Sequence, residues 1–88
     1  MSGSSLSPVE QVYLRTLAHC LCHRRGLAMA FSRTPAGSLR VEACGFYGPW
    51  AWATIDVESE NVARSEYRAP VTPYDVADGL TKRLRALR

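Results

Sequence analysis

The residues best equipped for chemistry lie together in a His-Cys-Leu-Cys-His stretch at positions 19–23. Imidazoles and thiolates are ligands of zinc, and a structural zinc ion needs four of them in a tetrahedral arrangement. On a helix, the two histidines share one edge, whereas the two cysteines point to different sides. A site of His19, His23 and Cys44, the remaining thiol of the chain, lacks a fourth protein ligand. We therefore predict no metal ion and no other cofactor.

Two other residue patterns could support catalysis. A nucleophilic enzyme needs a nucleophile, a base and a group that orients the base. Cys22 or Cys44 with a neighbouring histidine supplies only the first two of these. Asp56, Glu58 and Glu60 have the two-residue spacing of paired carboxylates, but they lie beside an expected turn, where water solvates them. Both patterns are incomplete, and we predict that the protein is not an enzyme.

The most informative feature is an aromatic run that contains Phe46, Trp50 and Trp52. Successive side chains of a β-strand point to opposite faces. Both tryptophans therefore share one face, and the alternating apolar residues from Ala51 to Val57 share the other. If helices cover the apolar face, the two indoles and Phe46 lie on an uncovered sheet surface. The alternative is a bulge at the Gly-Pro pair before Trp50, which reverses the alternation and turns the tryptophans into the core.

Clustered aromatic residues on a surface usually mark a contact site. Arginine supplies every basic residue except Lys82, and its bidentate and stacked contacts suit protein interfaces. The acidic segment that begins at Asp56 could imitate DNA phosphates at a basic site of a nucleoprotein partner. The predicted partner-binding residues are Phe46, Trp50, Trp52, Arg40, Asp56, Glu58 and Glu60.

Two segments carry the start signals and the one-sided apolar spacing of helices. Ser7, Pro8 and Glu10 fit a capped helix start, and we predict this first helix over residues 8–25. A Thr-Pro-Tyr-Asp stretch repeats the same start signal, and we predict a second helix over residues 73–87. Because each helix is apolar on one side, each must cover another surface.

Between the helices, alternating apolar and polar residues predict strands over 27–34, 39–47 and 50–58. Residues 62–69 fit a charged edge strand, with a short helix as the rival interpretation. The predicted order is α-β-β-β-(β)-α. This is an α+β fold in which an antiparallel meander of three or four strands packs both helices on one face.

The composition places the chain among small globular proteins. Its 88 residues, 47% of them hydrophobic, suffice for a single domain over residues 7–88 after a flexible tail of residues 1–6. No apolar run approaches the ~20 residues of a membrane span, and no secretory signal is visible, so we expect no membrane partner. Three cysteines are an odd number, which favours free thiols in a reducing, cytoplasmic compartment.

The net charge of +3 is divided unevenly, with basic residues at both ends and acidic residues in the middle. This division gives little support to the coherent basic face that phosphate binding needs. The helix–three strands–helix order resembles the double-stranded-RNA-binding domain at the level of topology, over most of the chain. That resemblance implies phosphate contacts from basic residues at the start of the second helix. Asp75 and Asp78 occupy that start in this sequence, and Lys82 and Arg83 come later.

Three functional hypotheses follow. The one we favour is a small non-enzymatic intracellular regulator or inhibitor that covers the surface of a protein partner, such as a nucleoprotein complex. This profile is similar to that of phage and mobile-element inhibitors of host defence, anti-CRISPR proteins among them. The second hypothesis is a nucleic-acid-binding domain. The third is a homodimer that buries the tryptophans between two sheet faces.

Overall fold

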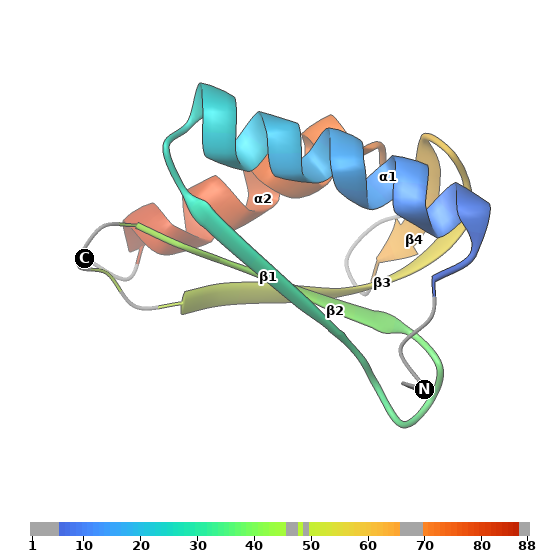
Figure 1. Cartoon of the computed structure of the whole chain (residues 1–88). Helices are drawn as coiled ribbons and strands as arrows, with labels where there is room; N and C mark the ends of the chain where they lie inside the picture. The colour runs from blue at the N-terminus through green and yellow to red at the C-terminus, as the bar shows by residue number, and fades with distance from the viewer. Residues whose placement is uncertain (1–5, 46–47, 49, 66–69, 87–88) are drawn as a thin grey trace.

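The chain forms an N-terminal helix, a four-stranded sheet and a C-terminal helix (Figure 1). The computed structural model describes residues 6–45, 48, 50–65 and 70–86. In chain order the elements are α1 (Pro8–Ala18), η1 (His19–Arg24), β1 (Ala28–Arg33), β2 (Leu39–Cys44), β3 (Trp50–Ser59), β4 (Val62–Ser65) and α2 (Pro73–Ala86). The predicted α+β order is confirmed, and the fourth strand is present.

Some predicted features lie outside the described residues. They are the tail at residues 1–5, the end of the second strand at 46–47, the end of the fourth at 66–69, and Leu87. Within the described residues, the observed ends of the first three strands differ from the predicted ones by no more than one residue, and the starts of the second and third agree.

The start of α1 has the capping box that the sequence predicts. Ser7 Oγ accepts a hydrogen bond from the Glu10 amide at 3.2 Å, and Glu10 Oε1 accepts one from the Ser7 amide at 2.9 Å. These bonds satisfy backbone donors that have no partner within the helix. Arg33 Nη1 of β1 donates to Glu10 Oε2 at 2.8 Å, and this guanidinium contact lowers the pKa of Glu10 to about 2. The helix start is thereby tied to the first strand.

The predicted first helix is correct up to Ala18 and wrong beyond it. Residues His19–Arg24 form a π-helical turn, in which each amide bonds one residue further back than in an α-helix. Cys20 and Leu21 face the core, and the residues after them are exposed. Gly26 then adopts a left-handed φ of 66°, which ends the turn before β1. The spacing of the buried residues fits both helix types, so it could not reveal the wider turn.

The four strands form one antiparallel sheet in the order β1-β2-β3-β4. Alternate residues of β2 and of the first half of β3 are buried. The register pairs Val41 with Ala53 and Glu42 with Trp52, so the buried residues of the two strands share one face. Both helices lie over that face and contact β3, as predicted (Figure 1).

The core lies between the helices and this face of the sheet. Much of the sheet contribution is small, namely Ala43, Ala51, Ala53 and Ala63, all of them buried. The helices supply bulky buried residues, among them Tyr13, Leu17 and Leu80. Small residues of the sheet thus face large residues of the helices, which is how a core reaches close packing.

Polar contacts join segments that are far apart in the sequence. Tyr13 Oη of α1 donates to the carbonyl oxygen of Val71, just before α2, at 3.1 Å. Burial, followed by the negative charge of Asp75, raises the pKa of Tyr13, so the phenol remains a donor. Just after η1, Arg25 forms an ion pair with Asp78 of α2. These contacts hold the two helices in place over the sheet.

Candidate functional site

We use the term open face for the sheet surface opposite the helices. From β2 and β3 it carries Arg40, Glu42, Cys44, Trp50, Trp52, Thr54 and Asp56. These residues alternate along each strand with the buried residues that contact the helices. The sequence predicts a surface of this kind, and β2 and β3 position it.

Both tryptophans point outward from the open face. Trp50 is 48% exposed and Trp52 is 41% exposed, whereas Ala51 and Ala53 are buried. The alternative in which a bulge turned the indoles into the core is therefore wrong. Ala51 and Ala53 instead belong to the core beneath the helices.

Arg40 lies over the ring of Trp52. Its guanidinium carbon is 4.4 Å from the ring centroid, the geometry of a cation–π contact. Arg40 Nε is 3.7 Å from Glu42 Oε1, close enough for an ion pair and too long for a hydrogen bond. Within the described part of the chain, this shielded Nε has no hydrogen-bond acceptor. Trp52 and Glu42 together hold Arg40 in place, while 43% of its side-chain surface stays exposed.

A residue that sequence reasoning missed supports this strand from behind. Arg83 of α2 donates a hydrogen bond to the backbone carbonyl oxygen of Trp52. The two residues are far apart in the sequence, and no local pattern links them. The sequence places Arg83 only among the basic residues late in the second helix, whereas its guanidinium helps to fix the position of the exposed tryptophan.

The predicted acidic residues lie at the other end of β3. Ser38 Oγ donates to Asp56 Oδ1 at 2.5 Å, and Arg64 Nε of β4 donates to Glu58 Oε2 at 2.8 Å. Glu60 is exposed in the turn between β3 and β4. Asp56 follows Trp52 by four residues, which corresponds to ~13 Å along a strand.

The predicted site therefore divides into two groups. One consists of Trp50, Trp52 and Arg40, and the other consists of the acidic residues at the far end of β3. Phe46 lies outside the described residues. Arg40 and Arg64 alternate with acidic side chains across β2, β3 and β4, so the described part of this surface carries charges of both signs.

The histidines and cysteines of the first helix do not converge on one site. The rings of His19 and His23 stack at 4.9 Å on the exposed side of η1. Cys20 is buried, Cys22 is exposed, and all three cysteines of the chain are free. Among the described residues, no three His, Cys, Asp or Glu side chains gather as metal ligands.

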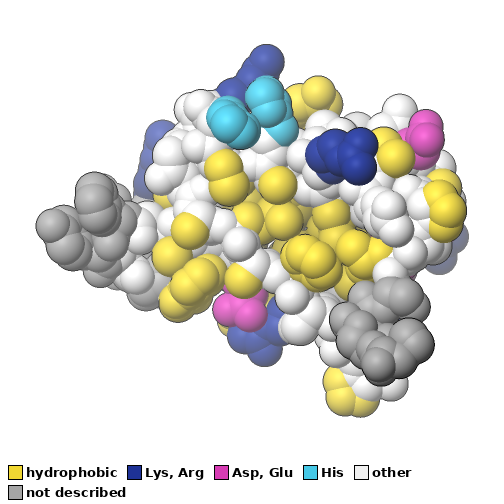
Figure 2. All heavy atoms as spheres, in the orientation of Figure 1, with side chains coloured by type: hydrophobic (Ala, Val, Ile, Leu, Met, Phe, Trp, Pro, Cys, Tyr) yellow, Lys and Arg dark blue, Asp and Glu magenta, His cyan; other side chains and the backbone are white. Residues whose placement is uncertain are grey.

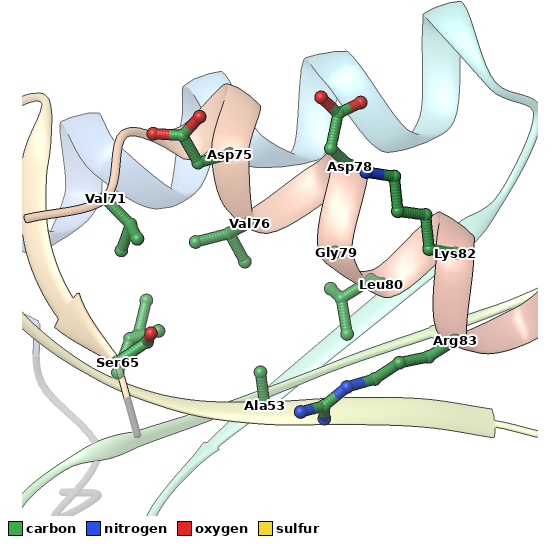
Figure 3. Close-up of a pocket in the computed structure, with 11 residues that line it drawn as sticks. Ala53, Ser65, Val71, Asp75, Val76, Asp78, Gly79, Leu80, Lys82 and Arg83 are labelled. Atoms are coloured by element: carbon green, nitrogen blue, oxygen red, sulfur yellow. The ribbon is translucent and has the colours of Figure 1, made fainter. Parts of the chain in front are cut away.

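A second candidate is a cavity of about 390 Å³ between α2 and the sheet (Figure 3). Val76 and Leu80 of α2 face Ala53 of β3 across it, and the Arg83 side chain extends along the strand beside them. The carboxylate of Asp78 points away from the cavity, toward the outer side of α2. Apolar side chains thus line the centre of the cavity, and Ser65, Asp75, Lys82 and Arg83 also border it.

Comparison with known proteins finds no matching family model, no similar curated protein and no similar solved structure. Among the described helices, none is both long and apolar enough to cross a membrane.

Proposed function

We propose that this protein is a small, non-enzymatic binding module that recognises a protein partner through its open face. The observation that carries the proposal is the exposure of two neighbouring tryptophans, Trp50 at 48% and Trp52 at 41%. Tryptophan and arginine are the residue types most enriched among those that dominate binding energy. A sheet surface that displays both types is suited to covering part of another protein.

The rigidity of the open face supports this proposal. Trp50 and Trp52 lie on a strand that pairs with β2, and Arg83 bonds to the carbonyl oxygen of Trp52. Arg40 is held against the Trp52 ring before any partner arrives. Side chains that are ordered in advance lose less conformational entropy on binding. The indoles would enter apolar pockets of the partner, and the exposed end of Arg40 would bind a carboxylate.

The acidic end of β3 suggests the chemistry of the partner. Asp56, Glu58 and Glu60 would face a basic surface, such as the nucleic-acid site of a nucleoprotein complex. A phage or mobile-element inhibitor of host defence, similar to anti-CRISPR proteins, would use such acids in place of DNA phosphates. The protein would act there by occlusion, as a regulator or inhibitor. The three free cysteines support an intracellular, cytoplasmic location.

Nucleic-acid binding is the second candidate function, and one observation favours it. A base could stack on exposed Trp50 or on the Trp52–Arg40 pair, as bases stack on aromatic residues of single-strand binders. The mixed charges around the tryptophans favour it less, because phosphate contacts need a coherent basic surface. Binding that weakens steeply with added salt would indicate this function.

Affinity purification with the tagged full-length chain tests the proposal. A variant with both Trp50→Ala and Trp52→Ala should lose the proteins that the wild type captures from its native host, with an unchanged circular dichroism spectrum. Tyr74→Ala is the matched control, because Tyr74 is 54% exposed but lies on α2. It should capture the same proteins as the wild type. Equal capture by the double-tryptophan variant would refute the proposal.

A further inference from the structure

β1 differs from the other strands because it is exposed on both faces. Four of its six residues are exposed, and only Met29 and Arg33 are half-buried. Phe31 is 44% exposed. No described strand pairs with the outer edge of β1. At its outer edge, β1 therefore presents exposed apolar side chains together with backbone groups that no described strand pairs with.

The hydrogen-bond phase of β1 can be derived from the hairpin that follows it. The Thr34 amide donates a hydrogen bond to the Ser38 carbonyl oxygen at 2.9 Å, so the backbone N–H of Thr34 points toward β2. Alternate residues of an antiparallel strand bond to the same neighbour. The even-numbered residues of β1 therefore bond to β2. The residues whose N–H and C=O groups point outward are Met29, Phe31 and Arg33.

An independent contact agrees with this phase. If the backbone N–H and C=O groups of the even-numbered residues of β2 point toward β1, then those of Glu42 form no hydrogen bond with Trp52, which lies opposite it in β3. The backbone groups of Trp52 must then point away from β2. They do, because the Trp52 carbonyl oxygen accepts a hydrogen bond from Arg83 of α2.

The outward residues also share the helix side of the sheet. Met29 lies opposite Ala43, and Phe31 lies opposite Val41, both of which are buried beneath the helices. Figure 2 shows hydrophobic side chains gathered beneath α1 in the middle of this view. Phe31 belongs to the exposed hydrophobic residues of the chain, and Met29 packs against the core. The described helices leave this edge of the apolar face partly uncovered.

We infer that β1 pairs with β1 of a second copy of this chain, antiparallel, about a two-fold axis through Phe31. Phe31 then lies opposite Phe31 of the second copy, and Met29 lies opposite Arg33 of the second copy. In this register every outward N–H and C=O group of the strand gains a strand partner. An axis through Ala30 would place Arg33 opposite Leu27, beyond the end of the strand.

The charges of β1 favour a second copy as the occupant. Arg33 is the single charged residue of the strand, and it is paired with Glu10. Self-pairing therefore places no like charges opposite each other. Edge strands that stay unpaired usually carry exposed charges, prolines or bulges that block pairing. The residues of β1, Ala-Met-Ala-Phe-Ser-Arg, provide none of these except the paired arginine.

The symmetry of the pair also accounts for the uncovered apolar edge. The axis that relates two antiparallel strands runs perpendicular to the sheet, so the helices of both copies lie on the same side. The α1 helix of each copy would then flank the Phe31 pair and help to cover it. A single strand from another protein would bring no second helix to cover Phe31. The two open faces would lie together on the opposite side.

Light scattering with size-exclusion chromatography, over the widest soluble concentration range, tests this inference. The wild-type mass should rise from 9.7 kDa toward twice that value as concentration increases. Phe31→Lys should remain at the monomer mass with an unchanged circular dichroism spectrum. Tyr74→Lys, at another exposed aromatic residue, should associate like the wild type. A wild type that stays monomeric at every concentration would overturn the inference.

Amide hydrogen exchange of the wild type decides the case even if Phe31→Lys fails to fold. The amides of Met29, Phe31 and Arg33 should become protected as concentration rises, while those of Ala30 and Ser32 are protected throughout. A dimer with unprotected outward amides would place the contact elsewhere. The variant with both tryptophans replaced by alanine should still dimerise. Its dissociation would assign the contact to the open face, so this test is separate from the test of partner binding.

Discussion

The open face and the outer edge of β1 both expose large hydrophobic residues, but they expose the backbone differently. Trp50 and Trp52 lie on a strand that is hydrogen-bonded to β2, and Arg83 donates a hydrogen bond to the Trp52 carbonyl oxygen. Phe31 lies on a strand with no described neighbour on its outer side. The open face therefore offers side chains to a partner of any local structure. The β1 edge offers a row of backbone groups to which another extended strand can bond.

This difference separates two kinds of recognition in one small sheet. Side-chain recognition depends on the identity of a few residues, so substitutions at those residues should weaken it strongly. Strand pairing depends on the main chain, so it tolerates changes of side chain but not the loss of an amide or the addition of a charge. Each region should therefore respond to substitutions that leave the other unchanged.

The largest expected effect concerns partner binding. Replacing both Trp50 and Trp52 by alanine should weaken affinity for the captured partner at least ~30-fold, because hot-spot residues contribute about 2 kcal/mol or more. Both indoles are exposed, so the free energy of unfolding should change little. Calorimetric titration and chemical denaturation measure the two quantities. A large loss of stability with full retention of binding would mean that the tryptophans support the core and do not contact the partner.

The next effect tests the backbone phase of β1. Ala30→Pro removes an amide that bonds to β2, and it should lower the free energy of unfolding by about 2 kcal/mol. Met29→Pro removes an outward amide, so it should cost less stability but prevent association of two copies. Denaturation and light scattering provide the readouts. Met29→Ala measures the loss of core contacts that Met29→Pro shares. If Met29→Pro costs more than Ala30→Pro after this loss is subtracted, the derived phase is wrong.

The difference between local and distant contacts also explains what the sequence could predict. The start of α1 follows from Ser7 and Glu10, which are three residues apart, and the outward tryptophans follow from strict alternation. In both cases the spacing of nearby residues determines the local geometry. The contact between Arg83 and Trp52 joins α2 to β3. No local periodicity encodes such a contact, because it depends on how the helix lies over the sheet.

The same reasoning applies to the π-helical turn and to the division of the predicted site. Cys20 and Leu21 are buried in either helix type, so the hydrophobic pattern could not distinguish an α-helix from a π-helix. Asp56 and Trp52 both belong to the predicted site and are only four residues apart in the sequence. An extended strand separates residues by ~3.3 Å each, so four residues suffice to place them at different ends of a surface.

A smaller effect concerns the contact that ties α1 to β1. The pKa of Glu10 is about 2 in the folded protein, below its ordinary value of 4.5, because Arg33 donates to it. Ionised Glu10 therefore stabilises the fold fully above pH 4.5, and this contribution declines as the pH falls toward 2. Glu10→Gln should lower the free energy of unfolding at neutral pH by about 1 kcal/mol.

The acid side of the stability profile checks this assignment. Between pH 4.5 and about 2, the wild type should lose more stability than Glu10→Gln, and the two profiles should converge at the acid end. Denaturation at a series of pH values provides the measurement. Parallel profiles would show that the ion pair contributes no net stability. The association of two copies should persist in Glu10→Gln, because Arg33 lies opposite Met29 of the second copy and not opposite another arginine.

The smallest expected effect concerns the contact between Arg40 and Trp52. Arg40→Ala removes a partly exposed cation–π contact, so the free energy of unfolding should fall by only about 0.5–1 kcal/mol. The Trp52 ring should become more accessible to a neutral quencher, measured in a Trp50→Phe background so that one indole reports. Phe31→Lys should leave this quenching unchanged, because β1 and Trp52 are separated by β2. Equal quenching with and without Arg40 would mean that the guanidinium does not hold the ring in solution, and the rigidity of the open face would then depend on the strand alone.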